Sequence, residues 1–149
     1  MYTDPHSGLR FLVPEGWTQQ AKTNLPVGPI SRGEVTLVLY RTFGTNSASF
    51  EVSCRDIDED VDLGEFLGKR KRSGLAWTRV GSATSMECGG KSATRFILEG
   101  KPRDTKLTME VTVIRQGKRV YFLAGTYPSG DSVRRGEIQQ FFKDLSWLH

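Results

Sequence analysis

Residues 8–17, Gly-Leu-Arg-Phe-Leu-Val-Pro-Glu-Gly-Trp, are the stretch that decides the fold of this chain. Apolar side chains at alternate positions (Leu9, Phe11 and Val13) fall on one side of an extended segment, because strand side chains alternate between two faces. A Pro-Glu-Gly turn then ends the strand, since proline and glycine are typical of turns. Trp17 follows at once, and its large indole predicts a core anchor at the edge of a sheet.

The residues after this opening predict more strands, recognised by alternation or by apolar character on both faces. Residues 22–34 interrupt them as a long connection rich in proline and glycine. The expected strands are residues 18–21, 35–41, 50–55, 77–84, 92–99, 107–113 and 120–127, with a short anchoring strand or hook at 147–148.

Two segments have helical patterns. Asp62-Leu63-Gly64-Glu65 has the form of a capping box, and Gly74 stands where a left-handed cap would close that helix. Phe66 and Leu67 are its expected core residues. The second helix is expected to begin at Asp131 or Ser132. Its apolar positions follow the i, i+3, i+4, i+7 spacing of a face packed on a sheet: Ile138, Phe141, Phe142 and Leu145.

The segment 120–127 predicts a central strand covered on both sides. Val120, Phe122 and Ala124 would face one way, and Tyr121 and Leu123 the other. Hairpin-length connections in the second half require antiparallel pairing. The sequence therefore predicts an α+β fold, a mostly antiparallel sheet of about six strands or more packed by helices. No repeat or linker divides the chain, so residues 1–149 are expected to form a single domain.

The Pro-x-Gly-Trp end of the first strand, the middle helix, the hairpins and the terminal helix together resemble the PsbP-like family, over roughly residues 2–148. This family includes a photosystem II extrinsic subunit and a nuclear Ran-binding factor. The resemblance implies a PsbP-like fold and a non-catalytic accessory role through protein surfaces. Its bacterial relatives include chaperones for transmembrane segments of toxin effectors. No partner-specific motif of these proteins is present, and their shared fold does not define a reaction.

Composition narrows the class of protein further. The 149 residues are 37% hydrophobic and 26% charged, as in a globular domain. No run approaches the ~18 apolar residues of a membrane-spanning helix. The first residues lack the basic and apolar regions of a signal peptide.

Two cellular locations stay open: the cytoplasm, or, if an N-terminal signal was removed, an exported or periplasmic site. The net charge of +4 favours anionic partners only weakly.

No catalytic, cofactor-binding or metal-binding residue is predicted. His6 and His149 are the two histidines, both near the termini, whereas acyl-transfer triads hold a histidine between nucleophile and carboxylate. The acidic run 56–62 lacks the EF-hand pattern and is better explained as a helix entry. Gly89-Gly90 lacks the rest of a phosphate-binding motif, so a hairpin turn is favoured.

A basic run, Lys69-Arg70-Lys71-Arg72, has a counterpart in Arg134-Arg135. Four consecutive helical cations point around most of the helix circumference, so a solvated helix end is favoured over a nucleic-acid site. Cys54 and Cys88 are too few for a structural zinc site. Either they form a disulfide, which needs Cα atoms within ~7 Å, or they are two separate small hydrophobic residues.

The 22–34 loop is the expected partner-binding surface, through Leu25, Val27, Ile30 and Arg32. The simpler alternative is a loop that only wraps one end of the sheet. The leading hypothesis for function is a non-catalytic binding module with a protein partner. The alternative is a small-ligand-binding protein or enzyme with a cleft beside this loop.

Overall fold

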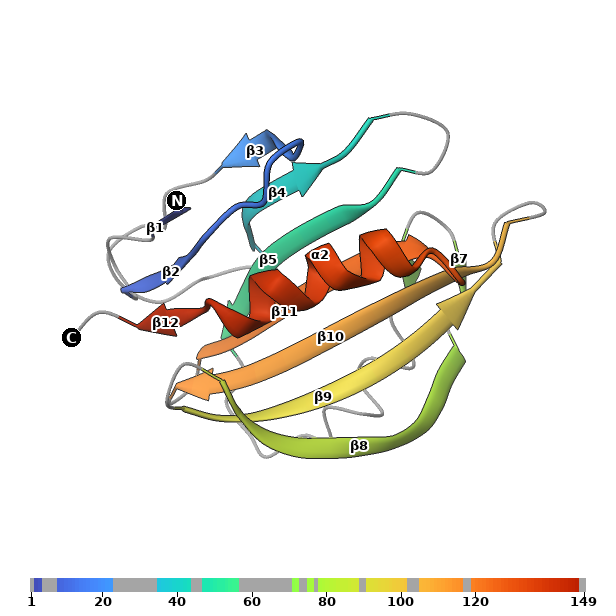
Figure 1. Cartoon of the computed structure of the whole chain (residues 1–149). Helices are drawn as coiled ribbons and strands as arrows, with labels where there is room; N and C mark the ends of the chain where they lie inside the picture. Colours follow the sequence, from blue (N-terminus) through green and yellow to red (C-terminus); the bar gives the residue numbers. More distant parts are fainter. Residues whose placement is uncertain are drawn as a thin grey trace.

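The computed structural model describes residues 2–3, 8–22, 35–43, 47–56, 71–72, 75–76, 78–88, 91–101, 105–116 and 119–147. A seven-stranded antiparallel sheet forms most of this part of the chain (Figure 1). The predicted α+β fold with an antiparallel sheet is therefore confirmed. In spatial order its strands are β3 (Thr18–Lys22), β4 (Val35–Arg41), β5 (Ser49–Asp56), β11 (Arg119–Pro128), β10 (Leu107–Gln116), β9 (Lys91–Gly100) and β8 (Thr78–Cys88).

The second half of the sheet is the predicted meander, in which β8, β9, β10 and β11 follow one another in sequence and in space. Cys88 of β8 pairs with Lys91 of β9, and the predicted turn at Gly89-Gly90 lies outside the described residues. Gln116 pairs with Arg119 in the same way. Hairpins this short fix the register, because a slip of one residue would turn every side chain to the other face.

The opening stretch belongs to a second, smaller sheet. Its strand, β2 (Leu9–Phe11), lies between β1 (Tyr2–Thr3) and β12 (Ser146–Trp147), which joins the two ends of the described chain. The sequence located both β2 and the terminal anchoring strand but did not predict that they pair. Leu9 and Phe11 are buried and Val13 packs against the core, as their alternation predicted.

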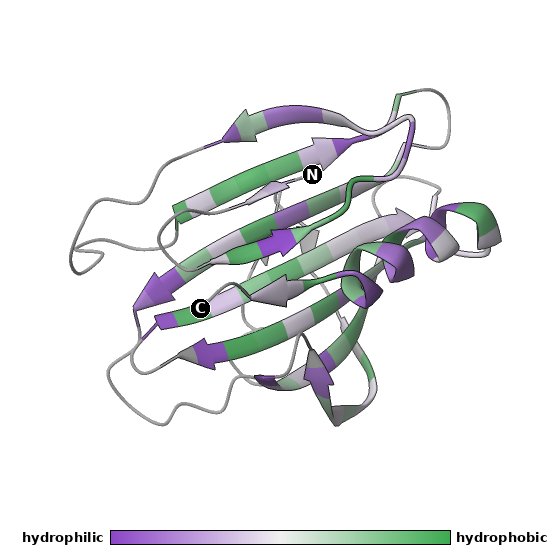
Figure 2. Cartoon of the chain, turned by 60° about the vertical axis from the view of Figure 1, so that its left-hand side comes forward, coloured by the Kyte–Doolittle hydropathy of each residue, from purple (hydrophilic) through white to green (hydrophobic). Residues whose placement is uncertain are grey.

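One helix, α2 (Ser132–Lys143), lies across one face of the main sheet (Figure 1). Asp131 is its N-cap, and its Oδ1 accepts a hydrogen bond from the Arg134 backbone N–H at 3.1 Å. In the hydropathy view, hydrophobic and hydrophilic segments alternate along this helix (Figure 2), as expected for a helix with one buried face. Ile138 is fully buried above β11, where Gly125 leaves room for it.

Aromatic rings join α2, the main sheet and β2 into one core. Phe141 stacks on Phe50 of β5, with ring centroids 4.1 Å apart and an interplanar angle of 3°. Trp17 packs edge-on against Phe141 with ring centroids 5.0 Å apart, and Phe11 packs edge-on against the same ring with centroids 5.6 Å apart. The predicted roles of Trp17 and Phe141 in the core are confirmed, and Leu145 is buried as well.

The strand β11 separates two groups of buried side chains. Tyr121 and Leu123 belong to the group beneath α2, whereas Val120, Phe122 and Ala124 belong to a second group that includes Phe96 and Val111. All five β11 residues are at most 3% exposed, so the prediction of a central strand covered on both faces is confirmed.

The prediction of a helix reaching Gly74 is wrong at its carboxyl end. Lys71 and Arg72 form a two-residue strand, β6 (Lys71–Arg72), which pairs with β7 (Leu75–Ala76). A glycine suits a reversal between two strands as well as it suits a helix cap, which explains the error. The rest of the predicted helix, with Phe66 and Leu67, lies outside the described residues. No helix in the described ranges is both long and apolar enough to cross a membrane.

Candidate functional site

The partner-binding residues expected from the sequence, Leu25, Val27, Ile30 and Arg32, lie outside the described residues. Their role stays a prediction. The structure places other candidate features on two parts of the surface: a groove beside β2, and the part of the helix-side sheet face that α2 leaves open.

The cysteines lie on separate strands of the main sheet. Cys54 is buried on β5, and Cys88 ends β8. Three strands lie between β5 and β8. At about 4.8 Å per strand spacing the two backbones are roughly 19 Å apart, far beyond the ~7 Å limit for a disulfide. The strand order therefore argues against a bond between them.

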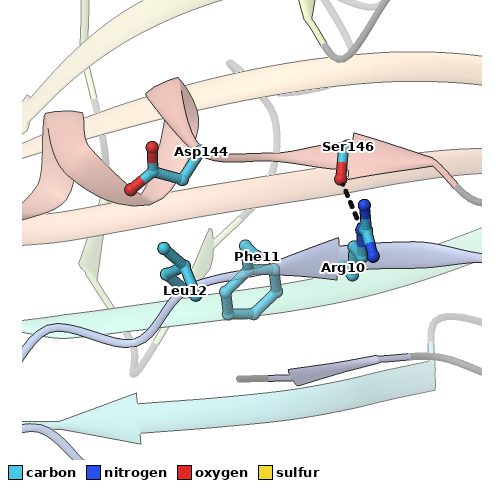
Figure 3. A pocket seen from close by; sticks show the side chains of 5 residues that line it. All are labelled: Arg10, Phe11, Leu12, Asp144 and Ser146. Carbon is cyan, nitrogen blue, oxygen red and sulfur yellow. Dashed lines mark hydrogen bonds between the residues drawn. The ribbon is translucent and has the colours of Figure 1, made fainter.

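A groove of about 230 Å³ lies between β2 and the junction of α2 with β12 (Figure 3). It is lined by Arg10, Phe11, Leu12, Asp144 and Ser146. Arg10 Nε donates a hydrogen bond to Ser146 Oγ at 2.9 Å, and Gln140 Nε2 donates one to Asp144 Oδ2. Ser146 is thus bonded to a cation and not to a general base, so this arrangement does not activate its hydroxyl as a nucleophile.

The second candidate is the part of the helix-side face that lies beyond α2, over β8 and β9 (Figure 1). Cross-strand pairing places Val80 opposite Ile97, and Ile97 opposite Glu110. The adjacent row runs from Thr84 through Arg95 to Thr112. Directly paired residues share a face, so both rows lie on the side of the sheet that carries α2.

We call Val80, Thr84, Arg95 and Ile97 the open face, with Glu110 and Thr112 at its border with α2. Val80 is 41% exposed and Ile97 is 38% exposed, although the two are neighbours on adjacent strands. On the helix-covered side of the same row, Gly125 and Phe50 are buried. The exposed apolar pair therefore begins where the cover of α2 ends.

A buried acidic group lies at that border. Glu110 is 3% exposed, and its Oε2 accepts a hydrogen bond from the Tyr127 hydroxyl at 3.1 Å. Burial, followed by the charge of Glu110 and this hydrogen bond, raises the pKa of Tyr127 to about 12, while Arg135 acts in the opposite direction. At neutral pH the phenol thus remains protonated and serves as the donor to the carboxylate.

Arg95 also links the open face to α2. Its Cζ lies 4.7 Å from the centroid of the Phe142 ring, within the range of a cation–π interaction. No group of three or more histidine, cysteine or acidic side chains that could hold a metal occurs in the described ranges.

The sequence did not point to the open face. Thr108, Glu110 and Thr112 alternate with apolar residues, which is typical of a strand with a solvent-facing polar side. In the structure all three are at most 9% exposed. Their burial depends on how α2 crosses the sheet, a tertiary arrangement that the local pattern does not contain. The exposed Val80 and Ile97 stand in segments recognised only as strands.

No protein-family model matches this chain, and a comparison with curated protein sequences finds no match either. Solved structures do match. The cyanobacterial PsbP protein CyanoP from Synechocystis sp. PCC 6803 is similar over 99% of this chain and 91% of its own, with a TM-score of 0.66 and 13% sequence identity.

Two other bacterial proteins have a similar structure. LpqN, which is involved in cell envelope biogenesis of Mycobacterium tuberculosis, matches 93% of this chain and 82% of its own, with a TM-score of 0.56 and 11% identity. PA94 of Pseudomonas aeruginosa is a protein of unknown function described as a putative regulator. It matches 83% of this chain and 94% of its own, with a TM-score of 0.52 and 12% identity. At these identities the similarity shows the fold alone, and the PsbP-like fold expected from the sequence is confirmed.

Proposed function

We propose that this protein is a non-catalytic binding module that acts through a protein–protein surface centred on the open face. One observation carries the proposal: Val80 and Ile97 are paired across adjacent strands and both are substantially exposed. Exposed apolar side chains that adjoin one another, with polar residues around them, are typical of surfaces that contact a partner. Burying these two side chains against a partner would remove apolar surface from water and so favour association.

The shape of β8 favours contact through side chains over contact through its backbone. Its register against β9 shifts between Val80 and Thr84, and Gly81 has a φ of +72°. Such a bulge bends an edge strand and disturbs the row of groups that an added strand would need. A partner is therefore expected to lie on the open face and not to extend the sheet at β8.

The structural neighbours support an accessory role without defining it. None of the three is named for an enzymatic activity, and LpqN is described as taking part in cell envelope biogenesis. The loop residues Leu25, Val27, Ile30 and Arg32 form a second proposed contact surface. The alternative of a small-ligand-binding protein or enzyme with a cleft beside the 22–34 loop is an outcome of the test below.

The test compares both surfaces with a control. A tagged domain captures its partner from an extract of its native cells, the partner is identified by mass spectrometry, and its Kd is measured with purified proteins. The variants are Val80→Ser with Ile97→Ser, and Leu25→Ser with Val27→Ser and Ile30→Ser. Val133→Ser is the control, because Val133 is 69% exposed on α2 and not part of either surface.

We expect the open-face double variant to raise the Kd at least ~10-fold, equivalent to about 1.4 kcal/mol. The control should leave it unchanged. A loss of binding confined to the loop variant would move the site to residues 22–34. Turnover of a substrate by the purified domain, lost when a cleft residue is replaced, would overturn the non-catalytic assignment.

A further inference from the structure

We infer that Arg95 is a carboxylate-binding anchor within the open face, so that the partner segment presents one acidic side chain between apolar ones. This inference rests on the proposed function, because it assigns a chemistry to the segment that covers Val80 and Ile97. It is carried by the described surroundings of Arg95, which hold a cation in place and contain no carboxylate paired with it.

Arg95 is held in position by a ring contact, but no described carboxylate pairs with its charge. Its guanidinium lies 4.7 Å from the centre of the Phe142 ring, and Phe142 is 5% exposed on α2. Its Nε is buried and has no hydrogen-bond partner among the residues that the structure describes. The ion pairs found in the described ranges do not include it. A buried charged donor without an acceptor is costly, so such a group is expected to acquire one when a ligand is bound.

The nearest acidic side chains on this face are already engaged. Glu110 accepts the hydrogen bond from Tyr127. Glu99 pairs with Lys106, with Oε2 and Nζ 3.1 Å apart. None of the described acidic side chains on this face is thus left to pair with Arg95, and we assign that carboxylate to the partner segment.

A second unsatisfied group lies directly across the strand pair from Arg95. Thr112 is fully buried and pairs with Arg95 on β9, and its Oγ1 has no hydrogen-bond partner within the described part of the chain. Cβ atoms of such pairs are about 4.5–5.5 Å apart, so the two unsatisfied groups adjoin each other beneath the open face. Both the guanidinium and the hydroxyl can donate, which matches the acceptor-only chemistry of an ionised carboxylate.

The charge and the apolar surface lie next to each other. The row that contains Arg95 adjoins the row of Val80 and Ile97. On the other side of Arg95 lies a third row, in which partly buried Met86 pairs with Ala93. An acidic residue flanked by apolar ones complements this arrangement, since the carboxylate would pair with the guanidinium while its neighbours cover the apolar side chains. Arginine binds carboxylates through two parallel hydrogen bonds, which adds specificity to the charge.

The experiment uses two capped peptides as probes, acetyl-Val-Leu-Glu-Leu-Val-amide and its glutamine analogue, which differ only in the carboxylate. Each is titrated into the ¹⁵N-labelled full chain, and amide shifts of residues 80–86 and 93–97 are followed by NMR. The glutamate peptide should shift these amides and bind at least ~10-fold more tightly than the glutamine peptide. Octanoate is titrated in parallel.

Three variants separate a binding role of Arg95 from a structural one. Arg95→Gln should abolish the difference between the two peptides. Arg95→Met, which keeps an apolar stem over Phe142, should do the same while leaving the midpoint of thermal unfolding nearly unchanged. Arg41→Gln, which removes an exposed cation from β4, should leave the ~10-fold preference intact.

Equal binding of both peptides at these amides would overturn the carboxylate assignment while leaving the apolar surface in place. A preference that survives Arg95→Gln would overturn the role of Arg95. Tighter binding of octanoate than of the glutamate peptide would assign the face to a lipid acid instead of a protein. Absence of shifts at these amides at millimolar peptide would overturn both this inference and the proposed surface.

Discussion

Two halves of one sheet face differ in how they are covered. Over β5 and β11, α2 packs aromatic and aliphatic side chains onto the strands, and Phe50, Leu123 and Phe141 are fully buried. Over β8 and β9 the same face leaves Val80 and Ile97 substantially exposed beside Arg95. The difference indicates that the covered half supplies most of the stability, whereas we propose that the open half contacts a partner.

The largest effect should come from the covered half. Phe141→Ala removes a ring that contacts Phe50, Trp17 and Phe11, and it leaves a cavity where α2 meets the sheet. We expect the free energy of unfolding to fall by ~3–5 kcal/mol, as for other buried aromatic residues. Urea denaturation followed by circular dichroism measures it. A loss below ~1 kcal/mol would mean that α2 is not docked in this way.

A close contact of backbone and helix predicts the next effect. A Cβ added at Gly125 would overlap Ile138 Cγ2 and lie 2.9 Å from its Cδ1. Gly125→Ala should therefore destabilise the fold by ~1–3 kcal/mol through overpacking. In the double variant with Ile138→Ala, the loss in free energy of unfolding should be smaller than the sum of the losses in the two single variants. Simple additivity in this double-mutant cycle would show that the two residues are not in contact.

This contact also illustrates what the sequence could and could not predict. The apolar spacing of α2 predicted that Ile138 and Phe141 face the sheet, and the alternation in β11 predicted two covered faces. Periodicity does not say which strand a helix crosses, so neither the match of Gly125 with Ile138 nor the open face could be foreseen. The pairing of β2 with β12 was missed because it joins residues far apart in the chain, and Gly74 was compatible with both a cap and a turn.

The border between the two halves should respond to alkaline pH. The pKa of Tyr127 is about 12 in the folded protein, against about 10 when unfolded. The unfolded chain therefore loses this proton first as the pH rises, and stability falls between pH 10 and pH 12 by an amount on the order of 1–2 kcal/mol. Below pH 10, Tyr127 adds no pH dependence to the free energy of unfolding.

Tyr127→Phe removes that part of the decline, so urea midpoints at pH 9 and pH 11 should differ less in the variant than in the parent protein. Glu110→Gln should also reduce the difference, because the charge of Glu110 and its hydrogen bond both raise the pKa of Tyr127. An identical decline in all three proteins would show that the Tyr127–Glu110 contact does not control this titration.

The smallest effect on stability should come from the open half. Val80 and Ile97 are only partly buried, so replacing both with serine removes little apolar surface from the core. We expect the free energy of unfolding to change by less than ~1 kcal/mol, as for most surface substitutions. A loss similar to that of Phe141→Ala would show that these residues belong to the core, and it would erase the distinction between the two halves.

The most direct test of the account measures stability and binding on the same protein. For the Val80→Ser, Ile97→Ser variant, the free energy of unfolding is determined by urea denaturation and the Kd for the captured partner by isothermal titration calorimetry. We expect the free energy of unfolding to stay within ~1 kcal/mol of the parent protein while the Kd rises at least ~10-fold. An unchanged Kd in a stably folded variant would contradict the claim that the open face is the binding surface.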